Sequence, residues 1–315
     1  MADRSDLKIV FMGTPDFASV CMDALVKSGY SVILAVCQPD KPVGRKHILT
    51  PPPVKVLASE LGIECYQPST LKTEEAYDKI KSLDPDLIVT AAYGKILPQN
   101  VLDIPEYGCL NCHGSLLPAR RGSAPVQRAI LEGDSVTGVT IMKMDAGMDT
   151  GDMLKKVEVA IDPDIHTDEL MAELAIKGSE LLVSMIDDYI EGKIVPEPQD
   201  PSKATLCPPI APEEGHFEWT DSALSIHNRV RALSTWPGAS TICQGKKLKI
   251  YDSSVVEDEG FSDGPAGTVV AAHKSDLIVR CGEGCLKINT LQAEGGKRLN
   301  ACDCAHNYKV GQLLT

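Results

Sequence analysis

The sequence predicts an α/β fold followed by a smaller β-rich region, and three features of the pattern support this. In the longer first part of the chain, short apolar runs alternate with helical patterns, which is typical of a parallel sheet with crossover helices. A stretch with six prolines then interrupts the pattern between residues 192 and 212. Beyond it, short apolar runs separated by turn residues favour a small β-barrel. At 315 residues the chain is long enough for two domains.

The elements of the first part follow from local patterns. The run before Gly13 is continuously apolar, which indicates a buried strand. Thr167 is an N-cap residue with acids after it, and an apolar stripe follows for more than twenty residues. Residues 39–53 contain five prolines and are expected to be a loop. We expect strands at 8–12, 31–37, 86–92, 107–113 and 138–144, and helices at 16–27, 54–61, 124–131 and 167–190.

The pattern of apolar residues changes in the second part of the chain. A helix is expected at 222–233, and the short apolar runs after it predict strands at 240–243, 248–251, 268–271, 277–281 and 286–291. We therefore divide the chain into a Rossmann-like domain (1–192), a proline-rich linker (193–212) and a C-terminal domain (213–315).

The turn after the first strand does not suit a dinucleotide. That fingerprint needs three glycines at G-x-G-x-x-G spacing and an acid after the second strand. Here only Gly13 is present, and Pro15 and Asp16 occupy the turn. A carboxylate there would repel a pyrophosphate, so we expect no NAD binding.

Composition limits the location and the metal chemistry. No run reaches about 18 consecutive apolar residues, so no membrane-spanning helix is expected. The first residues carry acids and resemble neither a secretory nor a transit peptide, which predicts a cytoplasmic protein. Eleven cysteines are then expected to be free thiols. The spacing of Cys281, Cys285, Cys302 and Cys304, with His306 nearby, departs from that of zinc sites, so no metal is expected.

Three polar residues form the candidate catalytic group. Asn111 and His113 are two apart near the end of an expected strand, so both side chains leave on one side. Ligands of open α/β sheets bind at that carboxyl end. With Asp149 in the loop Gly147–Gly151, they supply an oxyanion donor, a titratable imidazole and a carboxylate that holds it. The set suits acyl transfer, although each residue alone could have only a structural role.

Cys112 lies between the two polar residues and could be read as a nucleophile. Strand alternation points it to the opposite face, so we expect it to be packed in the interior rather than to react.

Several segments carry a family resemblance. Asn111-Cys112-His113-Gly114-Ser115-Leu116-Leu117-Pro118, followed by Gly147-Met148-Asp149-Thr150-Gly151-Asp152, resembles the folate-dependent formyltransferases, which move formyl from 10-formyltetrahydrofolate to an amine. The resemblance runs from about residue 7 to about residue 310. Further matching segments are Gly13-Thr14-Pro15-Asp16-Phe17, Gln38-Pro39-Asp40-Lys41-Pro42, Ala92-Tyr93-Gly94 and Arg121-Gly122-Ser123-Ala124-Pro125. Together these segments indicate a member that acts on methionyl-initiator tRNA.

The resemblance implies specific roles. Asn111, His113 and Asp149 would be the catalytic residues, with 10-formyltetrahydrofolate as co-substrate and no metal. The segment that would contact folate is Ser115, Leu116, Leu117 and Pro118. The C-terminal domain would have an OB-like fold that binds tRNA. We expect a monomer with no membrane partner.

The formal net charge of −13 conflicts with a tRNA substrate, because nucleic-acid binders usually show a basic footprint. The charge is uneven, however: residues 206–315 hold 11 Lys/Arg and 13 Asp/Glu, and residues 1–205 hold 20 and 31. A local patch binds phosphate, whatever the total. The expected tRNA contacts are Lys41 and Arg45 in the proline-bounded loop, and Arg229 and Lys247 in the C-terminal domain.

The chain departs from the family in two places. The loop Gly44-Arg45-Lys46-His47-Ile48-Leu49-Thr50 is less basic than we expect for such enzymes. After the linker, the chain has Leu206-Cys207-Pro208-Pro209, where similar enzymes usually carry a Tyr-Ala-x-Lys-type segment. A lysine that could support tRNA binding is therefore missing.

Two other functions remain open. A formyltransferase for a small amine, such as a purine-pathway ribonucleotide or an amino sugar, would use the same catalytic residues; the purine enzyme would need only the first domain. A non-catalytic RNA-binding protein on this scaffold would be expected to lose one of the three polar groups, and all three are present.

Overall fold

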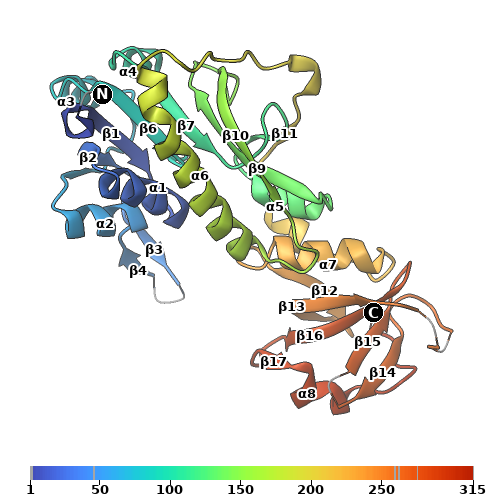
Figure 1. Cartoon of the computed structure of the whole chain (residues 1–315). Coiled ribbons are helices and arrows are strands. Elements are labelled where there is room, and N and C mark those ends of the chain that lie inside the picture. Colours follow the sequence, from blue (N-terminus) through green and yellow to red (C-terminus); the bar gives the residue numbers. More distant parts are fainter. Residues whose placement is uncertain (1–2, 45–46, 259, 262, 275, 315) are drawn as a thin grey trace. The chain divides into compact units, whose positions relative to one another are not determined.

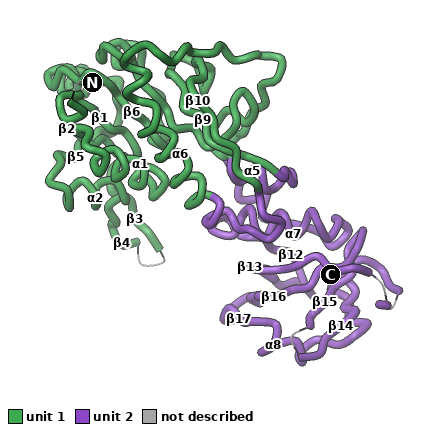
Figure 2. The backbone as a smooth tube through the Cα atoms, in the orientation of Figure 1, with its two compact units in different colours: residues 1–125, 136–160, 171–208 green, residues 126–135, 161–170, 209–315 purple. Residues whose placement is uncertain are grey.

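The computed structural model describes residues 3–314 except 45–46, 259, 262 and 275. Its internal contacts separate two compact units, drawn in two colours in Figure 2. Unit 1 holds Met1–Pro125, Val136–Ala160 and Met171–Pro208, and unit 2 holds Val126–Ser135, Ile161–Leu170 and Pro209–Thr315. Each unit is therefore discontinuous in sequence, and most of the expected linker belongs to unit 1 by its contacts.

Unit 1 is built on a seven-stranded sheet in the order β10-β9-β7-β6-β1-β2-β5 (Figure 1). The five strands from β7 to β5 are parallel, as expected, whereas β9 runs antiparallel to β7 and β10 antiparallel to β9. The strands are β1 (Lys8–Gly13), β2 (Ser31–Val36), β5 (Cys65–Tyr66), β6 (Leu87–Ala91), β7 (Cys109–His113), β9 (Val136–Lys143) and β10 (Met153–Ala160). The parallel sheet places the carboxyl ends of β1, β6 and β7 at one edge.

Helices cover both faces of this sheet. The helices that belong to unit 1 are α1 (Asp16–Lys27), α2 (Pro53–Leu61), α3 (Glu74–Lys81), α4 (Gln99–Leu102) and most of α6 (Thr167–Ile190), whereas α5 (Pro125–Leu131) falls almost wholly in unit 2. Val10 and Met12 of β1 pack in one cluster with Ile80 of α3 and Val101 of α4. On the other face, a Cβ added at Gly178 of α6 would lie 2.9 Å from the Cys112 sulfur of β7. The continuous apolar runs of the central strands therefore have a partner on each side.

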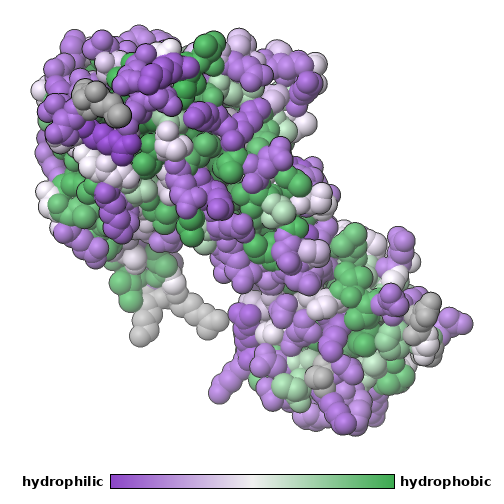
Figure 3. Space-filling view, viewed as in Figure 1, coloured by the Kyte–Doolittle hydropathy of each residue, from purple (hydrophilic) through white to green (hydrophobic). Residues whose placement is uncertain are grey.

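The segment 39–53 contains more structure than the expected loop. β3 (Lys41–Val43) and β4 (Ile48–Thr50) pair as an antiparallel hairpin. Pro42 is tolerated because this ladder has only two strands, both of them edges. Val43, Ile48 and Leu49 are 56%, 62% and 63% exposed, and Figure 3 shows apolar atoms on this hairpin. Three-residue strands are too short to show a period in the sequence.

The proline-rich segment is attached to unit 1 by a short ladder. β11 (Leu206–Cys207) runs parallel to β8 (Arg121–Gly122). Leu206 begins the segment that departs from the family pattern, and it is 70% exposed. Short 3-10 helices occur at Arg4–Asp6, Pro201–Lys203, Pro212–Gly215 and Ala305–Asn307.

Unit 2 contains an antiparallel sheet in the order β12-β13-β16-β15-β14, with β17 beside β16. Its core includes Phe217 and Trp219, whose rings meet edge to face with centroids 5.2 Å apart. Ser222 caps the helix that begins at Ala223 by accepting a hydrogen bond from the Ser225 N–H, which is the usual role of a serine at this position. The elements are α7 (Ala223–Ala232), β12 (Ala239–Cys243), β13 (Lys246–Val256), β14 (Val269–His273), β15 (Asp276–Arg280), β16 (Cys285–Ala293), β17 (Leu299–Asn300) and α8 (Ala301–Cys304).

Among the described residues, no helix has both the length and the apolar character needed to cross a membrane.

Candidate active site

The carboxyl end of β7 presents the two polar residues expected there. Asn111 pairs with Thr90 of the neighbouring strand β6, and the Thr90 hydroxyl donates to Asn111 Oδ1 at 2.9 Å. This bond fixes the amide orientation and directs its nitrogen elsewhere. No described residue is recorded as accepting from Asn111 Nδ2. The half-buried amide nitrogen is therefore able to donate to a bound molecule.

Both ring nitrogens of His113 face oxygen atoms. Nε2 lies 3.1 Å from the Arg120 carbonyl oxygen, and Nδ1 lies 3.7 Å from Asp149 Oδ1. The side chain is only 7% exposed. A neutral imidazole donates from one nitrogen only, whereas the imidazolium donates from both. The distance of 3.7 Å is too long for a hydrogen bond, so Nδ1 faces the carboxylate without being bonded to it.

Asp149 is held in position by its backbone and by one fixed oxygen. It has a φ of 54°, in the left-handed region that aspartate tolerates better than most residues. Gly122 N–H donates to Oδ2 at 2.8 Å, which leaves Oδ1 facing His113. The loop is closed by Thr150, whose hydroxyl donates to Asp145 Oδ1 at 2.7 Å. The structure thus brings together the three residues that the sequence singled out.

Gln199 is a site residue that sequence reasoning missed. Its amide nitrogen donates to the backbone oxygens of Asp149 at 2.8 Å and Gly151 at 2.7 Å. Its amide oxygen accepts from Arg121 Nε at 3.0 Å and Nη2 at 2.8 Å. The residue is 8% exposed, so these bonds are shielded from water. One side chain from the expected linker therefore joins the Asp149 loop to the segment after β7.

The expected folate segment divides into two buried and two more accessible residues. Ser115 and Leu117 are each 1% exposed. The Ser115 hydroxyl donates to the Ala119 carbonyl at 2.8 Å, and the Leu117 N–H donates to the Thr140 hydroxyl at 3.0 Å. Their polar groups are therefore occupied within the protein. Leu116 and Pro118 are half-buried and remain the members able to face a ligand.

The expected tRNA contacts differ in what surrounds them. Lys41 is exposed on β3, and its ammonium donates to Gln38 Oε1 at 2.7 Å. Arg45 lies outside the described residues. Arg229 is paired with Asp221 at 3.0 Å. Lys247 of β13 has an exposed side chain. None of these three described cations forms a hydrogen bond or an ion pair with a catalytic residue.

Cys112 lies on the opposite face of β7 from Asn111 and His113, as strand alternation predicts. It is 2% exposed, and its sulfur lies 3.9 Å from that of Cys21 in α1. The hydrogen bond shared with Cys21, together with burial, raises the pKa of Cys112 well above its usual value. A thiol held protonated and away from the site is a poor nucleophile. The eleven cysteines are free, and the described residues include no cluster of three His, Cys, Asp or Glu suited to a metal.

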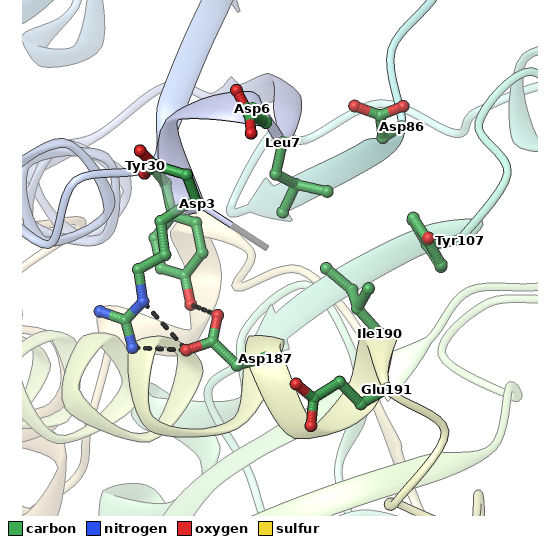
Figure 4. Close-up of a pocket in the computed structure, with 10 residues that line it drawn as sticks. Asp3, Asp6, Leu7, Tyr30, Asp86, Tyr107, Asp187, Ile190 and Glu191 are labelled. Atoms are coloured by element: carbon green, nitrogen blue, oxygen red, sulfur yellow. Dashed lines mark hydrogen bonds and ion pairs between the residues drawn. The ribbon is translucent and has the colours of Figure 1, made fainter. Parts of the chain in front are cut away.

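A hollow lies at the amino ends of the strands, away from this site (Figure 4). It has a volume of about 220 Å³ and lies between the starts of β1, β6 and β7 and the end of α6. The Tyr30 hydroxyl donates to Asp187 at 2.7 Å, and Arg4 donates to the same carboxylate. These groups satisfy one another, and none of them is among the catalytic candidates.

Comparisons with known proteins define the class. Residues 7–186 match the family model described as "Formyl transferase", and residues 209–309 match "Formyl transferase, C-terminal domain". An N-formyltransferase from Helicobacter canadensis has a similar structure, with a TM-score of 0.67 at 16% identity, covering 93% of this chain and 100% of that one. The chain therefore has the fold of a formyltransferase and belongs to that family.

The sequence relatives narrow the class. The methionyl-tRNA formyltransferase of Caldicellulosiruptor saccharolyticus is 44% identical over 313 residues, which cover 98% of this chain and 100% of the relative. A solved methionyl-tRNA formyltransferase from Clostridium thermocellum has a TM-score of 0.54 at 19% identity, covering 79% of this chain and 94% of that one. The chain belongs to the methionyl-tRNA formyltransferase family.

Proposed function

We propose that this enzyme transfers the formyl group of 10-formyltetrahydrofolate to the α-amine of methionyl-initiator tRNA, giving N-formylmethionyl-tRNA for translation initiation. The observation that carries the proposal is the convergence of Asn111, His113 and Asp149 in a chain of this family. An amide donor, an imidazole and a carboxylate at one strand end meet the needs of acyl transfer to an amine.

The reaction begins when the amine attacks the formyl carbon, which turns the formyl oxygen into an oxyanion. Asn111 Nδ2 would donate to this oxygen, because Thr90 already occupies the other end of the amide. The protonated Nδ1 of His113 would be a second donor, since it has no hydrogen bond of its own to Asp149 at 3.7 Å. Such donors stabilise charge that develops only in the transition state.

Asp149 would have two tasks. Its Oδ1 faces His113 Nδ1 at 3.7 Å and would keep the imidazole turned toward the reacting atoms. Its Oδ1 would also help to pass the proton of the attacking amine to the leaving nitrogen of the folate. The opposite oxygen is fixed by the Gly122 N–H at 2.8 Å, so the carboxylate keeps one orientation during this transfer.

The co-substrate would lie beside the loop that follows β7. We assign folate contact to the segment Ser115, Leu116, Leu117 and Pro118. Leu116 and Pro118 would supply apolar surface, and the buried Ser115 and Leu117 would hold the loop in shape through Ala119 and Thr140. No metal is required, because the formamide carbon is electrophilic and the site supplies positive charge.

We assign tRNA contact to Lys41 and Arg45 from the β3–β4 segment and to Arg229 and Lys247 from unit 2. The exposed apolar residues of the hairpin and the exposed Lys41 are accessible to a large substrate. In this assignment residues 1–192 are catalytic, residues 213–315 bind tRNA, and the segment 193–212 supplies Gln199 to the catalytic unit. We also propose a monomer in the cytoplasm, since one chain provides all three catalytic groups and charged tRNA is used there.

The decisive experiment mixes the purified protein with 10-formyltetrahydrofolate and charged initiator tRNA. We expect N-formylmethionyl-tRNA, and far slower reaction with free methionine, an amino-sugar nucleotide or a purine-pathway ribonucleotide. If a small amine were formylated faster than the charged tRNA, that amine and not tRNA would be the substrate. Absence of turnover on every acceptor, with folate bound, would favour a non-catalytic RNA-binding role.

A further inference from the structure

Two cysteines outside the catalytic site lie next to each other at the edge of the unit 1 sheet. Cys37 follows the last residue of β2, and Cys65 begins β5, the strand that pairs with β2. Their sulfur atoms are 3.5 Å apart. The Cys37 N–H donates to the Tyr66 carbonyl at 3.1 Å, so the backbone holds the two thiols together. Cys37 is fully buried and Cys65 is partly exposed.

The surroundings favour a reactive sulfur at Cys65. The hydrogen bond with Cys37 and the positive charge of Lys55 lower the pKa of Cys65, although burial and the negative charge of Asp40 oppose them. The pKa of Cys37 is raised, by its hydrogen bond to Cys65 and by burial. The pair thus combines an accessible sulfur inclined to be the thiolate with a buried thiol directly behind it. Accessible thiolates with a neighbouring thiol are the ones that peroxides oxidise reversibly.

We propose that Cys37 and Cys65 form a site at which a hydroperoxide oxidises the protein to an intramolecular disulfide. The Cys65 thiolate attacks an oxygen of the hydroperoxide, the O–O bond breaks, and the leaving oxygen takes a proton. Cys65 becomes a sulfenic acid. The Cys37 sulfur then attacks the Cys65 sulfur, the S–O bond breaks, and hydroxide leaves with the Cys37 proton as water. Two thiols lose two electrons and two protons, and the hydroperoxide is reduced to an alcohol or water, plus one further water.

A second close pair in the same unit is the natural control. Cys21 and Cys112 have sulfurs 3.9 Å apart, but both are buried and no lysine is recorded as acting on either. The pKa of Cys112 is raised. The sulfurs are therefore close together in both pairs. The Cys37–Cys65 pair differs because Cys65 is partly exposed and lies under the influence of Lys55. The structure predicts that peroxide distinguishes them.

The pair lies at the base of the segment that carries the β3–β4 hairpin. Asp40 accepts from Lys55 Nζ at 2.8 Å with each of its oxygens, and Gln67 donates to Asp40 at 2.8 Å. Forming the disulfide requires the sulfurs to approach by about 1.5 Å. It also removes the thiol whose pKa the charge of Lys55 lowers. Oxidation would then alter the anchoring of a segment to which we assign tRNA contact. This consequence rests on the proposed function, but the oxidation itself does not.

The test is mass spectrometry of the intact full-length protein after treatment with a few equivalents of hydrogen peroxide and alkylation of the remaining thiols. We expect one disulfide that joins the peptides of Cys37 and Cys65, reversed by dithiothreitol. In Cys37→Ser, Cys65 should stop at a sulfenic acid that dimedone traps. Cys302→Ser, which removes an exposed lone thiol, should leave the disulfide unchanged.

Lys55 provides a quantitative check. Lys55→Met should slow peroxide oxidation of Cys65 several-fold, and Lys55→Arg should restore most of the rate, with thermal unfolding measured to confirm that each variant is folded. Alkylation of both Cys37 and Cys65 after peroxide, or oxidation of the Cys21–Cys112 pair first, would overturn the proposal. None of these readouts uses formyl transfer, so they stand apart from the test of the proposed function.

Discussion

The carboxyl end of β7 and the cation-bearing surface of unit 2 hold their polar side chains in different ways. At β7, His113 and Asp149 are largely buried, and each has a defined oxygen or N–H partner. In unit 2, Lys247 is exposed, and Arg229 is paired with the partly exposed Asp221. Fixed and shielded groups suit a reaction that needs one geometry, whereas exposed cations suit a phosphate backbone that accepts many.

The strongest test of this contrast removes the catalytic groups. Asn111→Ala, His113→Ala and Asp149→Ala should each reduce turnover by roughly 10²-fold to 10⁴-fold, the usual range for an oxyanion donor or an acid/base group. The losses should be non-additive in double variants, because the groups act as a unit. Steady-state kinetics with charged initiator tRNA measures this. A folded variant with near-normal turnover would remove that residue from the mechanism.

A smaller effect is expected from Gln199, which bonds to the backbone oxygen of Asp149 rather than to its carboxylate. Gln199→Ala removes the bonds that join Asp149 and Gly151 to Arg121, so the carboxylate should lose its fixed placement. We expect kcat to fall by roughly 10-fold to 10²-fold, with KM for tRNA little changed. Asp200→Ala, in the next and exposed position, is the matched control. An equal fall in both variants would point to general loosening of this segment.

The β3–β4 segment should separate substrate recognition from chemistry. Arg45→Ala and Lys41→Ala should chiefly raise KM for initiator tRNA and leave folate binding nearly intact, because we assign both residues to tRNA contact and Lys41 bonds to Gln38 rather than to a catalytic residue. Kinetics with initiator and elongator tRNAs would show whether Arg45 distinguishes them. Unchanged tRNA kinetics in Arg45→Ala would mean that the weakly basic loop does not read the acceptor end.

The cations of unit 2 should act through salt-dependent affinity alone. Lys247→Ala and Arg229→Ala should weaken all tRNAs alike and lower the slope of log K against log salt by about one for each lost phosphate contact. Binding at several salt concentrations tests this. Because Arg229 is already paired with Asp221, its effect should be the smaller of the two. A lower kcat in either variant would contradict the view that the cations of unit 2 affect only tRNA affinity and the residues at β7 only the chemistry.

The smallest effect is expected on the other face of β7. Cys112→Val changes the side-chain volume little and touches none of the catalytic groups, so activity should stay within a few-fold. Thermal unfolding would detect any strain against Cys21. Complete loss of turnover at unchanged stability would support a covalent role for the thiol instead.

The sequence alone determined the local geometry of the site and the family of the chain. Side chains alternate in a strand, so Asn111 and His113 had to share one face of β7 and Cys112 had to take the other. The helices expected at 16–27 and 167–190 have their predicted bounds, and the helix expected at 222–233 covers Ala223–Ala232 with Ser222 as its cap. Thr167, expected to cap α6, is instead its first residue, and its hydroxyl donates to the Ala232 carbonyl at 2.6 Å. The alternation of strands and helices was enough to place the parallel strands in one sheet.

Only the tertiary structure decided which distant segments meet. Gln199 reaches Asp149 across fifty residues, and Cys37 meets Cys65 across twenty-eight. The β3–β4 hairpin and the antiparallel strands β9 and β10 likewise depend on pairing rather than on local pattern. A period of two or of 3.6 residues shows which face of an element is apolar, but it carries no information about the partner that covers it. Contacts made by single polar side chains between loops therefore had no signal in the sequence, because no repeat accompanies them.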